Sequence, residues 1–265
     1  MKKYLVIGNP IKHSLSPKLH NYWIKESGID AVYEKKQINT TDIKEIISKI
    51  KNDKIKGINV TVPFKKLVIP FLHELTPVAK ETQSVNTIYK KANKVIGDNT
   101  DVVGFERGLK HINYDVQGKK VFILGAGGVV SSIIVALKRM NISKIILSNR
   151  TQRKAEDLKK IYPDLDLVSW GDTVNFDMII NATSLGLKEN DEIKLNYDGV
   201  GSDKLFYDVI YNPGKTKFLL KGKKLGNQIE NGQAMFVYQA QLAFEIWHNI
   251  KPKVDEKVFS LLQND

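Results

Sequence analysis

The sequence predicts an α/β protein of two domains, the second of which is doubly wound. Short β-rich runs alternate with helical patterns along all 265 residues, a rhythm that is typical of largely parallel sheets. A glycine-rich turn, LGAGG at 124–128, follows one such run and opens a helical pattern. The sequence has no internal repeat and no flexible Gly/Ser linker, and its length is enough for two modest domains with cores of their own.

Composition excludes several kinds of chemistry. With 42% hydrophobic and 26% charged residues, the chain has the make-up of an ordinary soluble globular protein. It contains no cysteine, which rules out disulfides, thiolate nucleophiles and thiolate-bound zinc and agrees with a cytoplasmic location. The five histidines show no HExxH or other paired ligand spacing, so we expect no metal site.

The net charge of +12 raises the question of a nucleic-acid partner, because clustered cations release counterions from phosphate backbones. The lysines are scattered in pairs such as Lys35-Lys36 and Lys119-Lys120. A solvated lysine-rich surface is therefore favoured, and we expect no nucleic-acid partner. Residues 121–137 are uncharged, but glycines and Ser131-Ser132 break the stretch, which predicts a strand, a turn and a packed helix in place of a membrane span.

The first hundred residues predict four strands and three helices. The strands are expected over 4–8, 31–38, 57–62 and 86–91. The helices are expected to start at Ser16-Pro17, at Thr41-Asp42 and near Phe64. Ser16 is a candidate N-cap with Pro17 in the first helical position, and Gly28 supplies the stop.

From about residue 100 the alternation predicts a doubly wound unit. Strands are expected over 119–125, 143–149, 176–181 and 205–210 and near 166–169, with helices over 128–140 and 151–161. Residues 231–250 then carry apolar residues at helical spacing, which predicts a long amphipathic helix, followed by a shorter one over 254–263. The expected division is one domain of 1–100 plus 232–265 and a second, Rossmann-like domain of 101–231.

The LGAGG turn is the setting in which glycines let the backbone approach a pyrophosphate and a helix N-terminus stabilises its charge. Val130 replaces the third glycine of the full dinucleotide pattern, so a plain turn is the alternative. After the next strand, Asn149 and Arg150 stand where NAD-binding domains carry an acidic residue, with Arg153 and Lys154 behind. A guanidinium grips a 2′-phosphate that a carboxylate repels. NADP is therefore favoured over NAD, and the alternative is an exposed basic helix start.

Four further stretches have to be explained together: PIKHSLSPKLHN (10–21), NVTVPFKK (59–66), VNTI with GDNTDVVGF (85–88 and 97–105) and ENGQAMFVYQAQLAFEIW (230–247). Their order, with GAGG, SNRT, NATSLG and YDVIYNPGKT between them, closely resembles the shikimate dehydrogenase family over nearly the whole chain. The resemblance implies an enzyme of two α/β domains with a cleft between them, in which NADPH reversibly reduces 3-dehydroshikimate to shikimate. The expected partner is this small-molecule substrate, and a homodimer is compatible with the sequence.

The resemblance also implies roles for individual residues. Lys65 and Asp101 are the implied catalytic pair. The implied substrate ligands are Ser14, Ser16 and Tyr211 for the carboxylate and Asn59, Thr61, Asn86 and Gln239 for the hydroxyl-bearing face. The implied cofactor residues are Gly125, Ala126, Gly127 and Gly128 of the turn, Asn149, Arg150, Thr151 and Lys154 at the adenosine phosphate, Asn181, Ala182 and Thr183 beneath the nicotinamide ribose, and Gly232 and Met235 close to the nicotinamide.

The chemistry of the residues agrees with these assignments. A polyhydroxy acid needs short polar side chains, and the stretches are rich in them. Taken singly, each residue has a structural alternative: Ser16 can cap a helix, Asn86 can hold a turn and Gln239 can lie on a wet helix face. Hydride delivery to a ketone builds negative charge on oxygen, which the Lys65 ammonium can stabilise and protonate. Lys66 is expected to be an exposed neighbour.

The turn departs from the family pattern by placing Val129, Val130 and Ser131 after its glycines, which bears on cofactor affinity and not on the fold. Three other functions stay open. A quinate or aminoshikimate relative would share the catalytic pair, although the basic SNRTQRK segment argues against the NAD-using quinate branch. An idle NADP-binding sensor would have no reason to keep Lys65 with Asp101. A nucleic-acid binder would show salt-sensitive DNA affinity.

Overall fold

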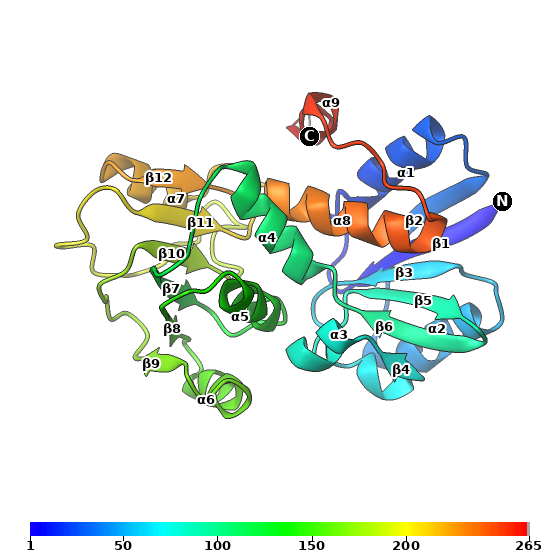
Figure 1. The fold of residues 1–265 in the computed structure, drawn as a ribbon, viewed down its shortest axis with the longest axis horizontal. Coiled ribbons are helices and arrows are strands. Elements are labelled where there is room, and N and C mark those ends of the chain that lie inside the picture. The colour runs from blue at the N-terminus through cyan, green and yellow to red at the C-terminus, as the bar shows by residue number, and fades with distance from the viewer. Residues whose placement is uncertain (264–265) are drawn as a thin grey trace. The chain divides into compact units, whose positions relative to one another are not determined.

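The computed structural model describes residues 1–263. These residues form two compact units. Unit 1 contains Met1–Gly104 and the chain from Val237 onward, and unit 2 contains Phe105–Phe236. Both boundaries fall inside helices, namely α4 (Asp101–His111) and α8 (Gln233–His248), as Figure 1 allows the reader to follow. The predicted class, α/β with two domains, is confirmed.

A six-stranded sheet forms the centre of unit 1 (Figure 1). Its order is β2-β1-β3-β5-β6-β4, and the strands are β1 (Lys2–Gly8), β2 (Ala31–Gln37), β3 (Gly57–Val60), β4 (Glu74–Leu75), β5 (Thr87–Lys91) and β6 (Lys94–Asp98). The strand β5 is antiparallel to both of its neighbours, and the other pairs are parallel. The four predicted strands are present, whereas β4 and β6 were not predicted because one has two residues and the other carries charges at both ends.

The helices of unit 1 are α1 (Ser16–Glu26), α2 (Ile43–Lys51), α3 (Pro77–Thr82) and α9 (Glu256–Gln263). Helix α2 shows why the pattern works, because its isoleucines recur at helical spacing and all of them are buried. Ser16 proves to be the first helical residue, while Leu15 occupies the N-cap position without a side-chain bond. Gly28, with φ +62°, follows the end of α1 as predicted.

The helix predicted near Phe64 is wrong. Residues 62–68 form hydrogen-bonded turns, and a short 3₁₀ helix, η2 (Ile69–Phe71), follows. Pro70 lacks the N–H group that an α-helix continuing through this segment would need. The turns nevertheless hold Phe64 and Val68 in the core of unit 1, where they are 1% and 0% exposed, so the residues between them have fixed places.

Unit 2 is built on a second six-stranded sheet, in which every strand pair is parallel. Its order is β12-β11-β10-β7-β8-β9, and the strands are β7 (Lys120–Leu124), β8 (Lys144–Ser148), β9 (Asp166–Val168), β10 (Met178–Asn181), β11 (Leu205–Asp208) and β12 (Gln228–Glu230). Read from β9, this is the doubly wound order, in which the strand order, not the strand direction, reverses beside β7, the first strand of the unit. The predicted doubly wound unit is confirmed.

The helices that belong to unit 2 alone are α5 (Val130–Arg139), α6 (Gln152–Ile161) and α7 (Lys217–Lys224). Helix α5 begins two residues later than expected, because the glycine turn extends to Val129. Helix α7 was not predicted, since its sequence KFLLKGKK is half lysine and contains Gly222. Gly222 packs on the Phe206 ring of β11, and an added Cβ would lie 2.4 Å from that ring.

No helix within residues 1–263 combines the length and the apolar character needed to cross a membrane.

Candidate active site

A lysine and a carboxylate form a buried contact in unit 1. Lys65 Nζ lies 2.5 Å from Asp101 Oδ2. The side chains are only 11% and 7% exposed, so the pair is largely removed from water. The neighbouring Lys66 is exposed, as predicted. An ammonium group that a carboxylate holds in position can donate a proton to a substrate oxygen that binds next to it.

Local structure fixes both partners. Lys65 lies in the turn segment between two core residues, and its carbonyl accepts a hydrogen bond from the Val85 amide at 2.9 Å. Asp101 is the first residue of α4. The Asn99 Oδ1 atom accepts the amides of Asp101 and Val102, at 3.1 and 3.3 Å, and so caps the start of the helix. Residues 36 positions apart are thereby brought into contact.

Asn86 ties the pair to its surroundings. The two hydrogens on its Nδ2 face three acceptors, Asp101 Oδ1 at 2.8 Å, Thr100 Oγ1 at 2.9 Å and Gln239 Oε1 at 3.3 Å. Its Oδ1 accepts the Thr100 amide at 2.7 Å. Asn86 is 3% exposed, and it joins a predicted residue of α8 to the carboxylate of the pair.

Asn59, on β3, belongs to the same cluster. Its Nδ2 donates to the Asn86 carbonyl and to Thr87 Oγ1, each at 3.1 Å, and its Oδ1 accepts the Tyr33 hydroxyl at 2.7 Å. Thr61 follows β3 and is partly exposed. The structure therefore brings Lys65, Asp101, Asn59, Asn86 and Gln239 into one hydrogen-bonded group.

The predicted carboxylate ligands are found at two places in the chain. Ser14 and Ser16 are adjacent at the start of α1, where Ser14 Oγ accepts the Ser16 amide at 3.3 Å. Ser16 is 7% exposed and Ser14 is partly exposed. Tyr211 belongs to unit 2 and stacks on Phe236, with 4.5 Å between the ring centroids.

The glycine turn of unit 2 is built for close backbone approach. Gly125 has φ +111°, and its amide donates to the Ser148 carbonyl at 2.8 Å. A Cβ at this position would lie 2.8 Å from the Ala182 carbonyl oxygen, so only glycine fits. Ala126, Gly127 and Gly128 continue the turn up to α5. The Ser131 hydroxyl in the first turn of α5 is buried and has no hydrogen-bond partner.

A second loop, after β10, lies against this turn. The Ala182 amide donates to the Leu124 carbonyl at 2.8 Å. Asn181 Oδ1 accepts the Thr183 amide at 3.0 Å and the Thr183 hydroxyl at 2.7 Å. Asn181 Nδ2 donates to Asp208 Oδ1 at 3.0 Å. The carboxyl ends of β7 and β10 thus carry two predicted cofactor loops side by side.

Asp208 is a functional candidate that the sequence reasoning missed. It is fully buried at the end of β11, and it accepts bonds from Asn181 Nδ2, the Ile210 amide and Thr216 Oγ1 at 3.0, 3.0 and 2.6 Å. Burial raises the pKa of the Asp208 carboxyl, and these three bonds oppose the rise. An acidic residue that ends a buried parallel strand was the available signal.

The amino end of α6 carries unneutralised positive charge. Thr151 occupies the N-cap position without a side-chain bond, and the first turn contains no acidic residue. Arg150, Arg153 and Lys154 are exposed there, while Asn149 Nδ2 donates to the Thr151 carbonyl at 2.7 Å. Cations at this end of a helix are unfavourable unless an anion binds.

Gly232 and Met235 lie at the start of α8. The Gly232 amide donates to the Ile210 carbonyl at 3.1 Å, and a Cβ on Gly232 would come within 2.2 Å of the Val209 oxygen. Met235 is 6% exposed and packs against Gly108 of α4. Together with the glycine turn, the orphaned Ser131 hydroxyl and the basic end of α6, these features fit a dinucleotide that carries an additional phosphate.

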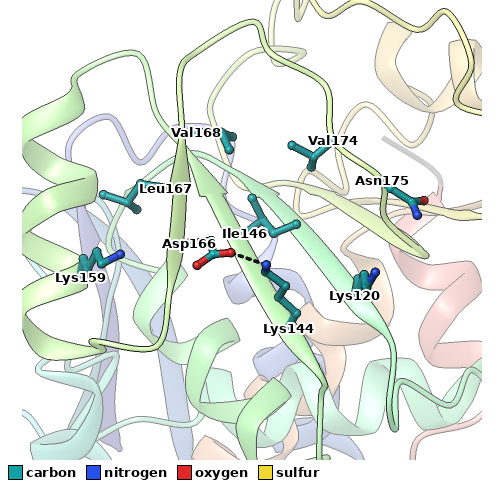
Figure 2. A pocket seen from close by; sticks show the side chains of 9 residues that line it. All are labelled: Lys120, Lys144, Ile146, Lys159, Asp166, Leu167, Val168, Val174 and Asn175. Atoms are coloured by element: carbon teal, nitrogen blue, oxygen red, sulfur yellow. Dashed lines mark ion pairs between the residues drawn. The ribbon is translucent and has the colours of Figure 1, made fainter.

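A pocket of about 380 Å³ lies elsewhere in unit 2 (Figure 2). It is lined by Lys120, Lys144, Ile146, Lys159, Asp166, Leu167, Val168, Val174 and Asn175. Lys120, Lys144 and Asp166 are the first residues of β7, β8 and β9. The pocket is therefore at the amino ends of these strands, whereas the predicted cofactor loops follow their carboxyl ends. Figure 2 shows the Lys144–Asp166 ion pair among its lining residues.

Among residues 1–263, no three His, Cys, Asp or Glu side chains gather in a way that would hold a metal ion.

Comparison with known proteins follows the same division of the chain. A model described as the shikimate dehydrogenase substrate binding domain matches residues 6–88, and one described as shikimate / quinate 5-dehydrogenase matches residues 108–186. A shikimate dehydrogenase (NADP(+)) of Pelagibacter ubique is 59% identical over 261 residues, which are 98% of each protein.

Solved structures agree. Shikimate dehydrogenase of Aquifex aeolicus has a TM-score of 0.90 and 38% identity, covering 100% of this chain and 98% of that one. The shikimate 5-dehydrogenase of Thermus thermophilus, in complex with NADP(H) and shikimate, has a TM-score of 0.89 and 26% identity, covering 99% and 98%. Relatives of this identity and coverage establish that the chain belongs to the shikimate dehydrogenase family.

Proposed function

We propose that this chain catalyses the NADPH-dependent, reversible reduction of 3-dehydroshikimate to shikimate, a step in the biosynthesis of aromatic amino acids, with Lys65 and Asp101 as its acid–base pair. The observation that carries the proposal is the buried Lys65–Asp101 contact within a cluster of amides and hydroxyls. The relatives support the reaction, since the Pelagibacter ubique protein is named for it and the Thermus thermophilus protein binds NADP(H) and shikimate.

In this proposal the chain's own residues handle the charge and the proton. The reduced nicotinamide, when bound, supplies a hydride to the carbonyl carbon. The Lys65 ammonium stabilises the charge that develops on the carbonyl oxygen and donates the proton that completes the alcohol. Asp101 holds Lys65 Nζ at 2.5 Å and orients it. In the reverse direction Lys65 takes the proton back.

The neighbouring residues would bind the rest of the substrate. Asn59, Thr61, Asn86 and Gln239 offer amide and hydroxyl groups for the ring hydroxyls, and the Ser14 and Ser16 hydroxyls suit a carboxylate. Tyr211 as a further carboxylate ligand stays a prediction.

For the cofactor, the glycine turn would receive the pyrophosphate, Arg150 and Lys154 the 2′-phosphate, and the Asn181–Thr183 loop with Gly232 and Met235 the nicotinamide end. The roles of these individual residues, including Asn149 and Thr151, are part of the proposal. Its support is the backbone geometry at Gly125 and the basic, uncapped start of α6.

A single assay tests the function. Purified protein is mixed with NADPH and 3-dehydroshikimate, and the absorbance of the reduced nicotinamide is followed. We expect a loss of absorbance that requires both compounds and is much slower with NADH. Tight NADPH binding without turnover would favour an idle sensor. Faster turnover with quinate than with shikimate in the reverse direction would move the protein to the quinate branch.

The pH dependence of the reverse reaction tests the role of Lys65. A general base accepts a proton only in its unprotonated form, and a rise in pH favours the unprotonated form of an amine. We expect the initial rate of shikimate oxidation, at saturating NADP, to rise between pH 7 and pH 10. A flat profile would contradict Lys65 as the base.

Two further properties complete the proposal. The absence of cysteine suits work in the reducing cytoplasm, which fractionation of the source cells would test. A homodimer is compatible with the sequence, and light scattering of the purified chain would measure the oligomeric state.

A further inference from the structure

A chain of buried hydrogen bonds runs from β2 to the carboxylate of the acid–base pair. It begins at Tyr33, a residue outside the proposed substrate and cofactor sets, whose hydroxyl donates to Asn59 Oδ1 at 2.7 Å. Asn59 Nδ2 donates to Thr87 Oγ1 at 3.1 Å, and Thr87 Oγ1 donates to Asn86 Oδ1 at 3.0 Å. Asn86 Nδ2 then donates to Asp101 Oδ1 at 2.8 Å. The donors of these hydrogen bonds all lie on the Tyr33 side of their acceptors, so the series runs in one direction toward the Asp101 carboxylate.

Backbone groups of fixed polarity set this direction. Asn59 Nδ2 also faces the Asn86 carbonyl oxygen, which can only accept, so the Asn59 amide cannot be turned over. Its Oδ1 must therefore face Tyr33, and the Tyr33 hydroxyl must donate. Asn86 Oδ1 faces the Thr100 amide, which can only donate, at 2.7 Å. The Asn86 Nδ2 group is thereby left for Asp101.

The residues that form these hydrogen bonds are buried, and Asn59, at 6%, is the most exposed of Tyr33, Asn59, Thr87 and Asn86. Tyr33 is 1% exposed, Thr87 is 0% exposed and Asn86 is 3% exposed. In such surroundings hydrogen bonds polarise one another, and a lost partner is not replaced by solvent. A change at Tyr33, where this series of hydrogen bonds begins, should therefore alter the surroundings of the Asp101 carboxylate, where the series ends.

The Tyr33 ring is held in place independently of its hydroxyl. The strand β2 is an edge strand, and Tyr33 reaches across β1 to Asn59 on β3. The ring stacks on His20, with centroids 4.2 Å apart and planes inclined by 2°, and it also contacts Trp247. Removing the hydroxyl alone would leave this packing intact.

We propose that Tyr33 is a positioning residue for the acid–base pair. Its hydroxyl fixes the Asn59 amide, and through Thr87 and Asn86 it holds the Asp101 carboxylate in the orientation that engages Lys65. The proposal deepens, and for its kinetic part rests on, the proposed function.

The test is Tyr33→Phe in the full chain. The substitution keeps the ring and leaves the buried Asn59 Oδ1 without its donor. We expect kcat for shikimate oxidation to fall about fivefold to tenfold, the scale of one buried hydrogen bond, while KM for NADP stays unchanged and KM for shikimate changes less than kcat. A merely structural role would lower thermal stability and leave kcat of the folded protein unchanged.

Tyr114→Phe is the matched control. The Tyr114 hydroxyl donates to the Asp177 carbonyl at 3.2 Å within unit 2, so this variant also loses one tyrosine hydrogen bond. We expect it to lose stability without a change in kcat. Equal losses of kcat in both variants would overturn the proposal.

Variants at Thr87 test whether the loss of the Tyr33 hydroxyl acts on Asp101 through the intervening hydrogen bonds. Thr87→Val keeps the shape and removes the link, whereas Thr87→Ser keeps the hydroxyl. We expect Thr87→Ser to retain kcat, and the double variant Tyr33→Phe/Thr87→Val to be no slower than Thr87→Val alone. Fully additive losses would overturn the proposal, because independent sites add.

A readout that needs no activity separates this proposal from the proposed function. In NMR spectra of the full chain, Tyr33→Phe should shift the side-chain amide signals of Asn59 and Asn86 and speed their hydrogen exchange, and Tyr114→Phe should not. If those signals move but the unmodified chain shows no turnover, the hydrogen-bonded chain stands and the proposed function fails. If the Asn86 signal and kcat are both unchanged, the proposal fails while the function stands.

Discussion

The two units prepare their sites in opposite ways. In unit 1 the polar side chains of the proposed substrate site already bind one another: Lys65 contacts Asp101, and Asn86 bridges Asp101 to Gln239. In unit 2 the proposed cofactor site consists of glycine backbone and of exposed cations such as Arg150 at an uncapped helix start. In the proposed mechanism, catalysis uses preformed side-chain geometry, while cofactor binding uses charge and backbone donors that await an anion.

The largest expected effect breaks the unit 1 side of the comparison. Lys65→Ala removes the proposed proton donor, so turnover should fall about a hundredfold or more, with little change in KM for NADPH. Steady-state kinetics measures both values, and Lys66→Ala, at the exposed neighbouring lysine, is the control. Near-normal turnover of the Lys65 variant would remove the pair from the mechanism.

The next effect breaks the unit 2 side. Arg150→Ala should raise KM for NADPH about tenfold or more, the scale of a charge-assisted bond, and leave kcat and the KM for NADH nearly unchanged. Lys120→Ala, at the pocket of Figure 2, removes a cation from the opposite, amino end of the strands of the same sheet. This control variant should change neither kcat nor the KM for NADPH. A fall in kcat with constant KM for NADPH would show that the two sites are not prepared differently.

A pair of glycines sharpens the comparison at the level of packing. A Cβ on Gly57 would lie 2.3 Å from Trp247 Nε1, so Gly57→Ala should lower the free energy of unfolding by about 1–3 kcal/mol. Gly222→Ala meets the Phe206 ring at 2.4 Å, but it also gains up to about 1 kcal/mol of helix propensity in α7. Urea unfolding should therefore show the smaller loss at Gly222. The opposite ranking would contradict this account.

A further effect concerns the pH dependence of the stability of unit 1. Burial, followed by the charge of His248, lowers the pKa of His20 to about 3, and burial, followed by the charge of Lys2, lowers the pKa of His248 to about 4. In the unfolded chain histidines take up protons as the pH falls through about 6.5. Stability should therefore be lost as the pH falls from about 6.5 to about 4 for His248 and to about 3 for His20, by at most about 1.4 kcal/mol per pH unit for each histidine.

His20→Phe isolates the contribution of His20. The substitution keeps aromatic packing and removes two ring nitrogens that have no hydrogen-bond partner. Urea unfolding between pH 7 and pH 4 should show a shallower decline for the variant. Parallel curves for the two proteins would contradict the assignment.

Much of the fold could be predicted because it depends on local pattern. The strands β7, β8, β10 and β11 of unit 2 contain continuous runs of apolar residues, and the isoleucines of α2 have helical spacing. Two of the strands that were not predicted, β4 and β12, have two and three residues, too few to show a period. The segment after Pro63 has a helical pattern because Phe64 and Val68, four positions apart, are both buried. Successive turns can produce this spacing as well as an α-helix can.

The proposed site was predicted unevenly for a related reason. Motifs brought Lys65 and Asp101 to attention, although their contact depends on the long-range pairing of β3 with β5. Tyr33 has no local signal, because its part in the hydrogen-bonded chain depends on the register of β1 with β2 and β3. Asp208 did have one, its place at the end of a buried parallel strand, and the sequence reasoning did not use it.

The Asp208 carboxylate has a consequence for how unit 2 tolerates change. One side chain serves the loop after β10, the loop after β11 and, through Thr216, the first turn of α7. All three segments are held by hydrogen bonds to the same carboxylate. A substitution that moves one segment can therefore shift this carboxylate and weaken its hydrogen bonds to the other two. Substitutions far from the glycine turn, at Thr216 for example, should therefore weaken cofactor retention without touching a cofactor residue.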